Sequence, residues 1–544
     1  RHIQFGRQLL LRQQHDNEAG DDGDDSFDLS HLQALSTVAA QLEQYENLVV
    51  ANLGEELVEL FLGWSPRNAD PDRARELMYD GLGVCGRDAL QRVYRIYVNR
   101  LLDVMRMTTR TTVGEFADEA DSSVKACVTS MTLDRFLDCL KLLLEQLLDS
   151  IKSAVAVQEF CTSLQQQQQS NDDNSGRVAL PFAKPSPDED APSEAVSSAA
   201  ELSAKSIAEL LRLRKEAHSL VALEEMKMLW NTCLSFLSQV ESLSPGFKAT
   251  GLRATLLSQA KAFVERKHES NMSAMAAALD SERWTQCDVS ADRQAQLTRL
   301  CSGRAVTSSR SSTTRPGGAS STDKSPEADV EGVRYKVVWS SLFLVEMVMM
   351  NIDCAAHFQS LATNVVSKVS ELLRLFNSRS TQLVLGAGAI HSAARLKSIN
   401  AKHLSLVTQC LGMTIAILPH VRAALMAQLP PKQHNLLTDL DSIKKEYGEH
   451  NEKVLNKFVT IVGGIVEHGL APRIGGTNFD TRARQLSEDV NPLPCCNFLD
   501  GVSTNTRKMH HVLNSLLPQD HLQDVFSRIL AFLDHKVPSL FDAA

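Results

Sequence analysis

The chain has 544 residues, of which 43% are hydrophobic and only 5% aromatic. A long chain of this composition can bury a large core and is typical of packed helices rather than sheets, so we predict an all-α fold. The formal net charge is -10, but residues 333–544 carry 21 Lys or Arg against 17 Asp or Glu. This basic excess is mild and dispersed. A nucleic-acid-binding domain needs a clustered basic stripe, so we expect no nucleic acid partner.

The 11 cysteines are scattered without a CxxC pair, and only Cys495 and Cys496 are neighbours. This pattern favours a reducing compartment over a secreted disulfide framework, and the first residues show no signal-peptide pattern. The most apolar window, Leu342–Met350, contains Glu346 and is much shorter than the roughly 20 residues that a membrane span requires. We therefore expect a cytosolic protein. Its beginning at Arg1 rather than Met is consistent with a fragment that lacks an N-terminal assembly region.

Apolar residues recur at three- and four-residue steps through the first part of the chain, which is the period of amphipathic helices. We predict an N-terminal helical region over residues 1–162, with helices near 30–64, 73–106 (interrupted near 81–86) and 132–161. A polar tract follows that contains five consecutive glutamines and an acidic Pro-Ser-Pro-Asp-Glu-Asp run. Because such a tract buries too little apolar surface to offset its ordering entropy, we predict a disordered linker over residues 163–200.

The helical pattern returns after this linker and is interrupted once more. The predicted regions are helices over 201–301, a Ser/Thr/Gly-rich linker over 302–332, a C-terminal helical module over 333–480 and C-terminal helices over 481–544. In the C-terminal module we expect a helix from 386 to 429, with a kink or stop at Pro419 and a firm stop at Pro430-Pro431. A last helix begins near Asp520, and we expect its apolar stripe to pack within this chain.

No catalytic constellation stands out, because the HExxH, GxSxG, Walker and paired-cysteine zinc motifs are absent. We expect no enzymatic activity, no cofactor and no metal. One alternative stays open, a nucleotide-dependent enzyme that binds a phosphate at Gly386 and Gly388. His391 stands where the third glycine of a GxGxxG loop would be. We therefore favour a packing role, in which these small residues let another backbone approach closely.

Two separated groups of motifs carry a resemblance to a known family. FNSRSTQLVLGAGAI at 376–390, ARLKSINAKHLSL at 394–406 and LPPKQH at 429–434 resemble the C-terminal region of the vacuolar protein sorting-associated protein 54 family. Upstream, SQAKAFVERKHES at 258–270 and LDSERWTQCDV at 279–289 are similar to that family's middle region. We expect the signature residues to be fold determinants rather than binding residues. They are Arg283, Trp284, Phe376, Asn377, Gln382, Leu383, Leu385, Gly386, Gly388, Pro430 and Pro431.

The resemblance implies elongated stacked helical bundles, a helical rod of the multisubunit tethering complex type, without enzymatic activity. Members of the family are subunits of the Golgi-associated retrograde protein (GARP) complex, which captures vesicles travelling from endosomes to the trans-Golgi network and promotes SNARE-dependent fusion. The expected partners are therefore three other GARP subunits, SNAREs of the endosome and trans-Golgi network, and small GTPases. We also expect a cytosolic protein peripheral on these membranes, with the C-terminal module as the targeting region. A subunit of the exocyst or of the endosome-recycling complex is the nearest alternative.

Overall fold

The computed structural model describes residues 29–85, 87–117, 123–170, 180–183, 193–303, 324–386, 388, 392–396, 398–476 and 497–542. Over these residues the prediction of an all-α fold is confirmed, and the strands are four short segments of two or three residues. The chain divides into two compact units, unit 1 with residues 1–262 and unit 2 with residues 263–544. The division falls inside helix α10 (Thr250–Ser281) and therefore inside the helical region predicted over 201–301.

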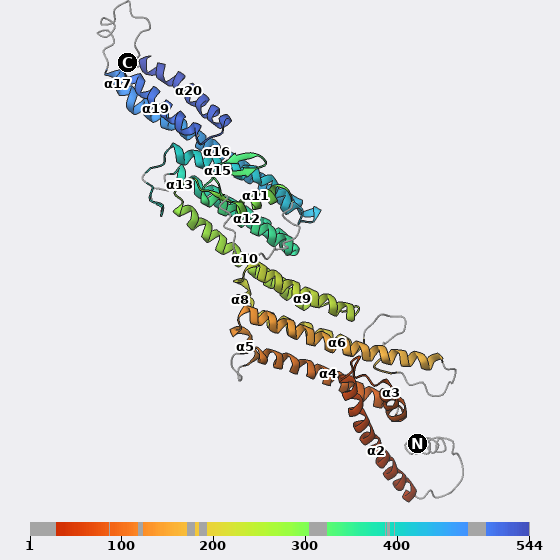
Figure 1. Ribbon diagram of the computed structural model, residues 1–544. Coiled ribbons are helices and arrows are strands. Elements are labelled where there is room, and N and C mark those ends of the chain that lie inside the picture. Colours follow the sequence, from red (N-terminus) through yellow and green to blue (C-terminus); the bar gives the residue numbers. More distant parts are fainter. Residues whose placement is uncertain are drawn as a thin grey trace, which may run out of the picture. The chain divides into compact units, whose positions relative to one another are not determined.

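Unit 1 consists of helices that lie side by side, with α6 between α4 and α9 (Figure 1). Before α10 its elements are α2 (Leu29–Leu62), α3 (Pro71–Arg75), η1 (Glu76–Gly81), η2 (Leu82–Cys85), α4 (Arg87–Glu115), α5 (Val124–Ser130), α6 (Leu133–Ser170), α7 (Glu194–Leu213), α8 (Lys215–Ser219) and α9 (Leu223–Leu243). Polar side chains cap the N-termini of some of these helices. Asp70 caps α3 by accepting the backbone N–H of Arg73 at 3.0 Å, and Ser123 caps α5 by accepting that of Ala126.

The linker predicted over 163–200 is shorter than expected at both ends. Helix α6 continues through the glutamine run to Ser170, and α7 already begins at Glu194. A glutamine run can extend an existing helix because glutamine has a good helix propensity. Residues 171–179 and 184–192 of the predicted linker lie outside the described residues.

A buried segment lies in the middle of the same predicted linker. The side chains of Leu180, Phe182 and Ala183 are buried in unit 1. The Phe182 ring packs edge-on against Phe61 and Tyr94, with ring centroids 5.2 and 4.9 Å apart. The tract therefore contributes an aromatic side chain to the core of unit 1, which its polar composition did not indicate.

Unit 2 is a second helical bundle in which α12, α13, α15 and α16 pack against one another. After α10 its helical elements are α11 (Ala291–Cys301), α12 (Trp339–His357), η4 (Gln359–Leu361), α13 (Ala362–Val384), α15 (Ala401–Met426), η5 (Pro431–Leu437), α16 (Thr438–Ile465), η6 (Val466–Leu470), α17 (Ala471–Gly475), α19 (Asn497–Asn514) and α20 (Gln519–Asp542). Helix α20 packs on α16 with Leu522, Val525 and Ile529 buried. The prediction that this stripe packs within the chain is confirmed for these three residues, whereas Leu530 of the same stripe is 59% exposed.

Helix boundaries in unit 2 correct the prediction of a helix from 386 to 429. Helix α13 ends at Val384, and α15 begins only at Ala401, where the side chain of Asn400 caps it. Pro419 lies inside α15, which continues past it to Met426. The stop at the proline pair has the expected position, because the chain leaves α15 before Pro430 and begins a 3-10 helix at Pro431.

The linker predicted over 302–332 also contains regular structure. Strand β1 (Val289–Ser290) pairs with β2 (Lys324–Ser325), and β3 (Ala328–Val330) pairs with β4 (Val333–Tyr335), both antiparallel. Glu331 and Gly332 join β3 to β4 with φ angles of 52° and 87°, as a tight two-residue hairpin turn requires. Strands this short carry no periodic pattern that could have predicted them. Residues 304–323 lie outside the described part of the chain.

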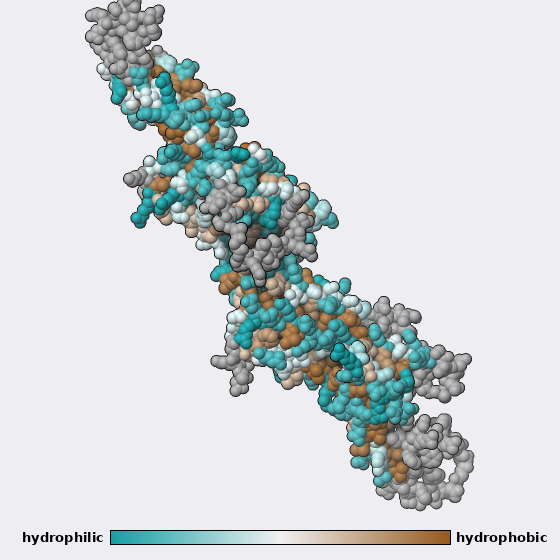
Figure 2. Space-filling model, in the orientation of Figure 1, coloured by the Kyte–Doolittle hydropathy of each residue, from teal (hydrophilic) through white to brown (hydrophobic). Residues whose placement is uncertain are grey.

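Among the described residues, three helical segments are long and apolar enough to cross a membrane by length and composition alone, namely α12, α15 and residues 431–475. This corrects the expectation that the most apolar window is too short. In the structure, 67% of the α12 window and 72% of the α15 window are buried, so their apolar residues form much of the core of unit 2. Figure 2 shows apolar residues scattered among polar ones on the visible surface of both units.

Candidate functional site: the junction of the sequence motifs

Asp280 and Arg379 connect the two groups of motifs. Asp280 lies in the last turn of α10 within LDSERW, and Arg379 lies on α13 within FNSRST. Oδ1 of Asp280 is 2.8 Å from Nε and 2.7 Å from Nη2 of Arg379. The backbone N–H of Ala394, where the ARLKSIN motif starts, donates to the carbonyl oxygen of Asp280 at 3.0 Å. Three motif segments therefore meet at one aspartate.

The upstream motif SQAKAFVERKHES lies along α13 through further polar contacts. Oε1 of Glu265 accepts from Nδ2 of Asn364 at 3.1 Å, and its Oε2 lies 3.1 Å from Nζ of Lys368. One turn later, Nε2 of His268 lies 2.9 Å from Oε2 of Glu371. These contacts tie the part of α10 that belongs to unit 2 to α13 over several turns.

Glu282 links the LDSERW motif to the start of α12. Its carboxylate is buried and accepts the backbone N–H of Trp284 at 3.1 Å and that of Ser340 at 3.0 Å. Ser340 is the second residue of α12, whose N-cap position is the apolar Val338 without a side-chain cap. The carboxylate therefore supplies the cap from another segment and places a negative charge at the positive end of the helix.

Trp284 is the largest fully buried side chain among the described residues, with 1% of its surface exposed. Its φ angle of 53° lies in the left-handed region, which is uncommon for a tryptophan. Burial of the indole and the hydrogen bond to Glu282 hold this conformation despite a cost of about 1–3 kcal/mol. The prediction of Trp284 as a fold determinant fits this geometry, whereas the neighbouring Arg283 is exposed.

Asn377 of the second motif group bonds to α16. Its Oδ1 lies 2.8 Å from Nδ1 of His450, and both side chains are buried. Burial, together with the nearby charge of Lys453, lowers the pKa of His450 to about 4. A neutral ring at physiological pH therefore joins α13 to α16. Tyr447, one turn earlier, donates to the carbonyl oxygen of Leu373 at 2.8 Å.

Gly386 and Gly388 follow the carboxyl end of α13. A Cβ atom at these positions would lie 2.7 and 2.9 Å from the carbonyl oxygen of Gln382. The backbone that approaches closely is thus the last turn of α13 itself, whereas we expected the backbone of another segment. Both positions need glycine because a side chain would collide with a main-chain atom.

The remaining signature residues fall into two groups. Phe376 and Leu383 are buried, and Leu385 is half-buried. Gln382 is exposed and accepts from Nη1 of Arg379 at 3.2 Å. Pro430 and Pro431 are exposed between α15 and α16. Asp280, Glu282 and Arg379 were not predicted as site residues, because charged residues in such polar motifs do not stand apart from their neighbours.

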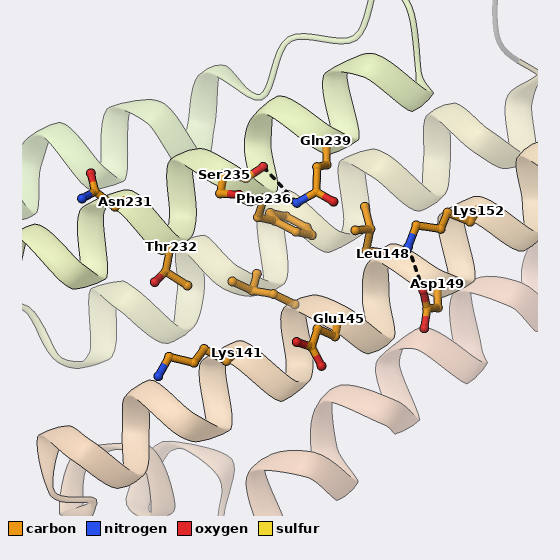
Figure 3. Close-up of a pocket in the computed structure, with 11 residues that line it drawn as sticks. Lys141, Glu145, Leu148, Asp149, Lys152, Asn231, Thr232, Ser235, Phe236 and Gln239 are labelled. Atoms are coloured by element: carbon orange, nitrogen blue, oxygen red, sulfur yellow. Dashed lines mark hydrogen bonds and ion pairs between the residues drawn. The ribbon is translucent and has the colours of Figure 1, made fainter.

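A separate groove runs between α6 and α9 in unit 1 (Figure 3), with a volume of about 750 Å³. Leu144, Leu148 and Phe236 form its apolar part, and an ion pair of 3.0 Å between Lys152 and Asp149 lies on its rim. Its lining contains no His or Cys. Such a groove can hold side chains of a ligand, but it lacks a nucleophile paired with a base.

Buried cysteines are also poor candidates for chemistry. Burial raises the pKa of the Cys233 and Cys410 thiols to about 12 and that of Cys139 to about 11. These thiols stay protonated near neutral pH and are weak nucleophiles. Among the described residues, no group of three or more His, Cys, Asp or Glu side chains is placed to hold a metal ion.

Comparison with known proteins agrees with the motifs. Residues 332–464 match the family model described as Vps54-like protein. Vacuolar protein sorting-associated protein 54 of Homo sapiens is 34% identical over 287 residues, which are 53% of this chain and 27% of that protein. The Mus musculus protein of the same name is 33% identical over 289 residues, which are also 53% of this chain and 27% of that protein. The Arabidopsis thaliana protein called vacuolar protein sorting-associated protein 54, chloroplastic, is 28% identical over 411 residues, 62% of this chain and 39% of that protein.

The matched segment spans about a quarter of the length of the mammalian relatives. Within unit 2, the matched residues 332–464 comprise α12, α13, α15 and α16, the helices that the motif contacts hold together. The resemblance predicted from the motifs is therefore confirmed, and residues 332–464 form a Vps54-like domain within a chain that is similar to vacuolar protein sorting-associated protein 54 over about half of its length.

Proposed function

We propose that this chain is a non-enzymatic subunit of the GARP vesicle-tethering complex, which acts in retrograde transport from endosomes to the trans-Golgi network and promotes SNARE-dependent fusion. The Vps54-like match over residues 332–464 carries the proposal. In this proposal the partners are three other GARP subunits, SNAREs and small GTPases, and the protein is cytosolic and peripheral on endosomal and trans-Golgi membranes. The C-terminal helical module serves as the targeting region.

Such a subunit works by binding rather than by chemistry. Helical surfaces that make many weak contacts in one assembled complex raise the effective concentration of a vesicle at its target membrane. The polar contacts of Asp280, Glu282 and His450 support this role indirectly, because they join α10, α12, α13 and α16 into one bundle. A binding surface needs such rigid support, since each immobilised side chain otherwise adds an entropic cost to association.

The alternative of a nucleotide-dependent enzyme has little support from the geometry. Phosphates bind at helix N-termini, where free N–H groups and the positive end of the dipole face the ligand. Gly386 and Gly388 instead follow the carboxyl end of α13, close to the carbonyl oxygen of Gln382. Fluorescence anisotropy with a labelled ATP analogue checks this point, and saturable binding that a Gly388→Leu change abolishes would favour the enzyme.

A transport assay in the protein's own cells tests the proposal. After depletion of the endogenous protein, we expect a receptor that cycles from endosomes to the trans-Golgi network to return severalfold more slowly. The wild-type chain and a Trp339→Ala variant restore the rate, whereas Trp284→Ala does not, because Trp284 is buried and Trp339 is 46% exposed. Unchanged receptor transport after depletion would contradict the proposal.

A further inference from the structure

We propose that one exposed face of α4 is a docking surface for an acidic amphipathic helix of another protein. The α4 face consists of Arg92, Arg95, Ile96, Asn99, Arg100, Asp103, Arg106, Met107 and Arg110. It lies in unit 1, outside the Vps54-like match, and its argument does not depend on the proposed tethering function.

These residues recur at three- and four-residue steps and therefore share one side of the helix. All of them are exposed. In Figure 1, α4 lies at the edge of unit 1 with α6 beside it. Helix α2 borders the face at Arg92 and Arg100, which bond to Asn47 and Glu55. From Arg92 to Arg110 the face is about 27 Å long, since each helical residue rises about 1.5 Å.

The charge of the α4 face is one-sided. It carries five arginines and one aspartate, although the whole chain has a net charge of -10. Arg100 pairs with Glu55 of α2 at 2.7 Å, and Arg106 pairs with Asp103 at 2.7 Å. No hydrogen bond or ion pair to another described residue is found for Arg95 or Arg110. Two guanidinium groups near the two ends of the face are thus available to carboxylates of a partner.

Apolar side chains lie between these arginines. Ile96 is 43% exposed and Met107 is 53% exposed, and Val104 at the edge of the face is 45% exposed. Arg and Met are enriched in protein interfaces, whereas Lys is depleted, and α4 contains no lysine. The planar guanidinium also binds carboxylates in a two-pronged geometry that lysine lacks. This composition favours a protein partner with Asp or Glu side chains.

The length and spacing of the α4 face define the partner helix. A matching partner helix is about five turns long, has apolar residues at three- and four-residue steps, and carries Asp or Glu on both flanks.

Site-specific photocrosslinking in the protein's own cells tests the proposal. A photoreactive amino acid replaces Met107 in the full chain, and the matched control places it at Met228, which is 47% exposed on α9. Mass spectrometry then identifies the peptide joined to each position. We expect position 107 to join a segment of another protein that has the acidic amphipathic pattern, and position 228 not to join that segment.

Charge reversal gives the second readout. Arg95→Glu with Arg110→Glu lowers the yield of the position 107 product at least tenfold, and exchanging two acidic residues of the identified segment for Arg restores it. The control pair Arg212→Glu with Lys215→Glu changes the charge equally at exposed positions and leaves the yield unchanged. Products with lipid, with this chain's own residues, or with a segment that lacks the acidic pattern overturn the proposal, as does insensitivity to the charge reversal. A negative result in the transport assay contradicts the proposed tethering function but does not contradict this docking proposal.

Discussion

Gly386 and Gly388 illustrate how single residues determine a helix end. The chain turns immediately after α13, and a Cβ atom at either glycine would lie within 3.0 Å of the Gln382 carbonyl oxygen. That oxygen belongs to the helix backbone, so it cannot move aside as a flexible side chain can. Gly448 offers a contrast, because it lies in α16 and a Cβ there would meet nothing within 4 Å.

Substitutions at the glycines after α13 and at Gly448 are therefore expected to have opposite effects. Gly386→Ala or Gly388→Leu costs unit 2 about 1–3 kcal/mol of unfolding free energy, because the new side chain forces the backbone to shift. Gly448→Ala stabilises it by up to about 1 kcal/mol, since alanine restricts the unfolded chain and favours the helix. Urea unfolding followed by circular dichroism measures both. A stabilised Gly386→Ala protein would refute this view of the turn.

At the scale of elements, the pairing of α13 with α16 depends on a histidine that must stay neutral. The pKa of His450 is about 4 in the folded chain and about 6.5 in the unfolded one. Between these values the unfolded state binds more protons, so the stability of unit 2 falls as the pH drops from 7 toward 4. At pH 5 the loss from this one group amounts to about 2 kcal/mol.

A His450→Gln variant tests this pH dependence. Glutamine can still bond to Asn377 but does not titrate, so we expect a shallower loss of unit 2 stability between pH 7 and pH 5 than in the wild type. The control His535→Gln changes an exposed residue of α20 and should retain the wild-type slope. Chemical unfolding at several pH values measures both slopes. Equal slopes for His450→Gln and the wild type would show that this histidine is not the titrating group.

The predictable elements were the long periodic ones. Helices α2, α6 and α16 have apolar stripes of many turns, which made their existence evident from the sequence. Phe182 was missed because a single aromatic residue in a polar tract carries no periodicity. The hairpin at Glu331-Gly332 was missed for the same reason, since each strand has only three residues. Within the candidate site, the burial of Trp284 and Asn377 fits the expectation that they are fold determinants. The pairing of Asp280 with Arg379 could not be predicted, because the two residues are far apart in the sequence and only the tertiary structure brings them together.

On the scale of the whole molecule, the chain has two compact units with separate aromatic anchors. Phe182 packs with Phe61 and Tyr94 in unit 1, and Trp284 is buried in unit 2. Each unit therefore has a core that a single truncation can weaken without touching the other. We expect two resolvable transitions when the full chain is heated.

Reciprocal truncations provide the corresponding prediction. Phe182→Ala lowers the midpoint of the unit 1 transition and Trp284→Ala that of unit 2, each through a loss of about 3–5 kcal/mol of core packing. Differential scanning calorimetry of the full chain measures both midpoints, and each variant serves as the control for the other. If either substitution shifted both transitions equally, the division into two units would not describe the folding of this chain.

The central claim, that this chain is a tethering subunit, is tested most directly by purification of the tagged full-length protein from its own cells, followed by mass spectrometry after a stringent wash. We expect three other subunits of a tethering complex, together with SNAREs of the endosome or trans-Golgi network. Trp284→Ala should reduce the recovery of any partner that binds unit 2, whereas Trp339→Ala should not. Recovery of none of these subunits with the wild-type chain would contradict the claim.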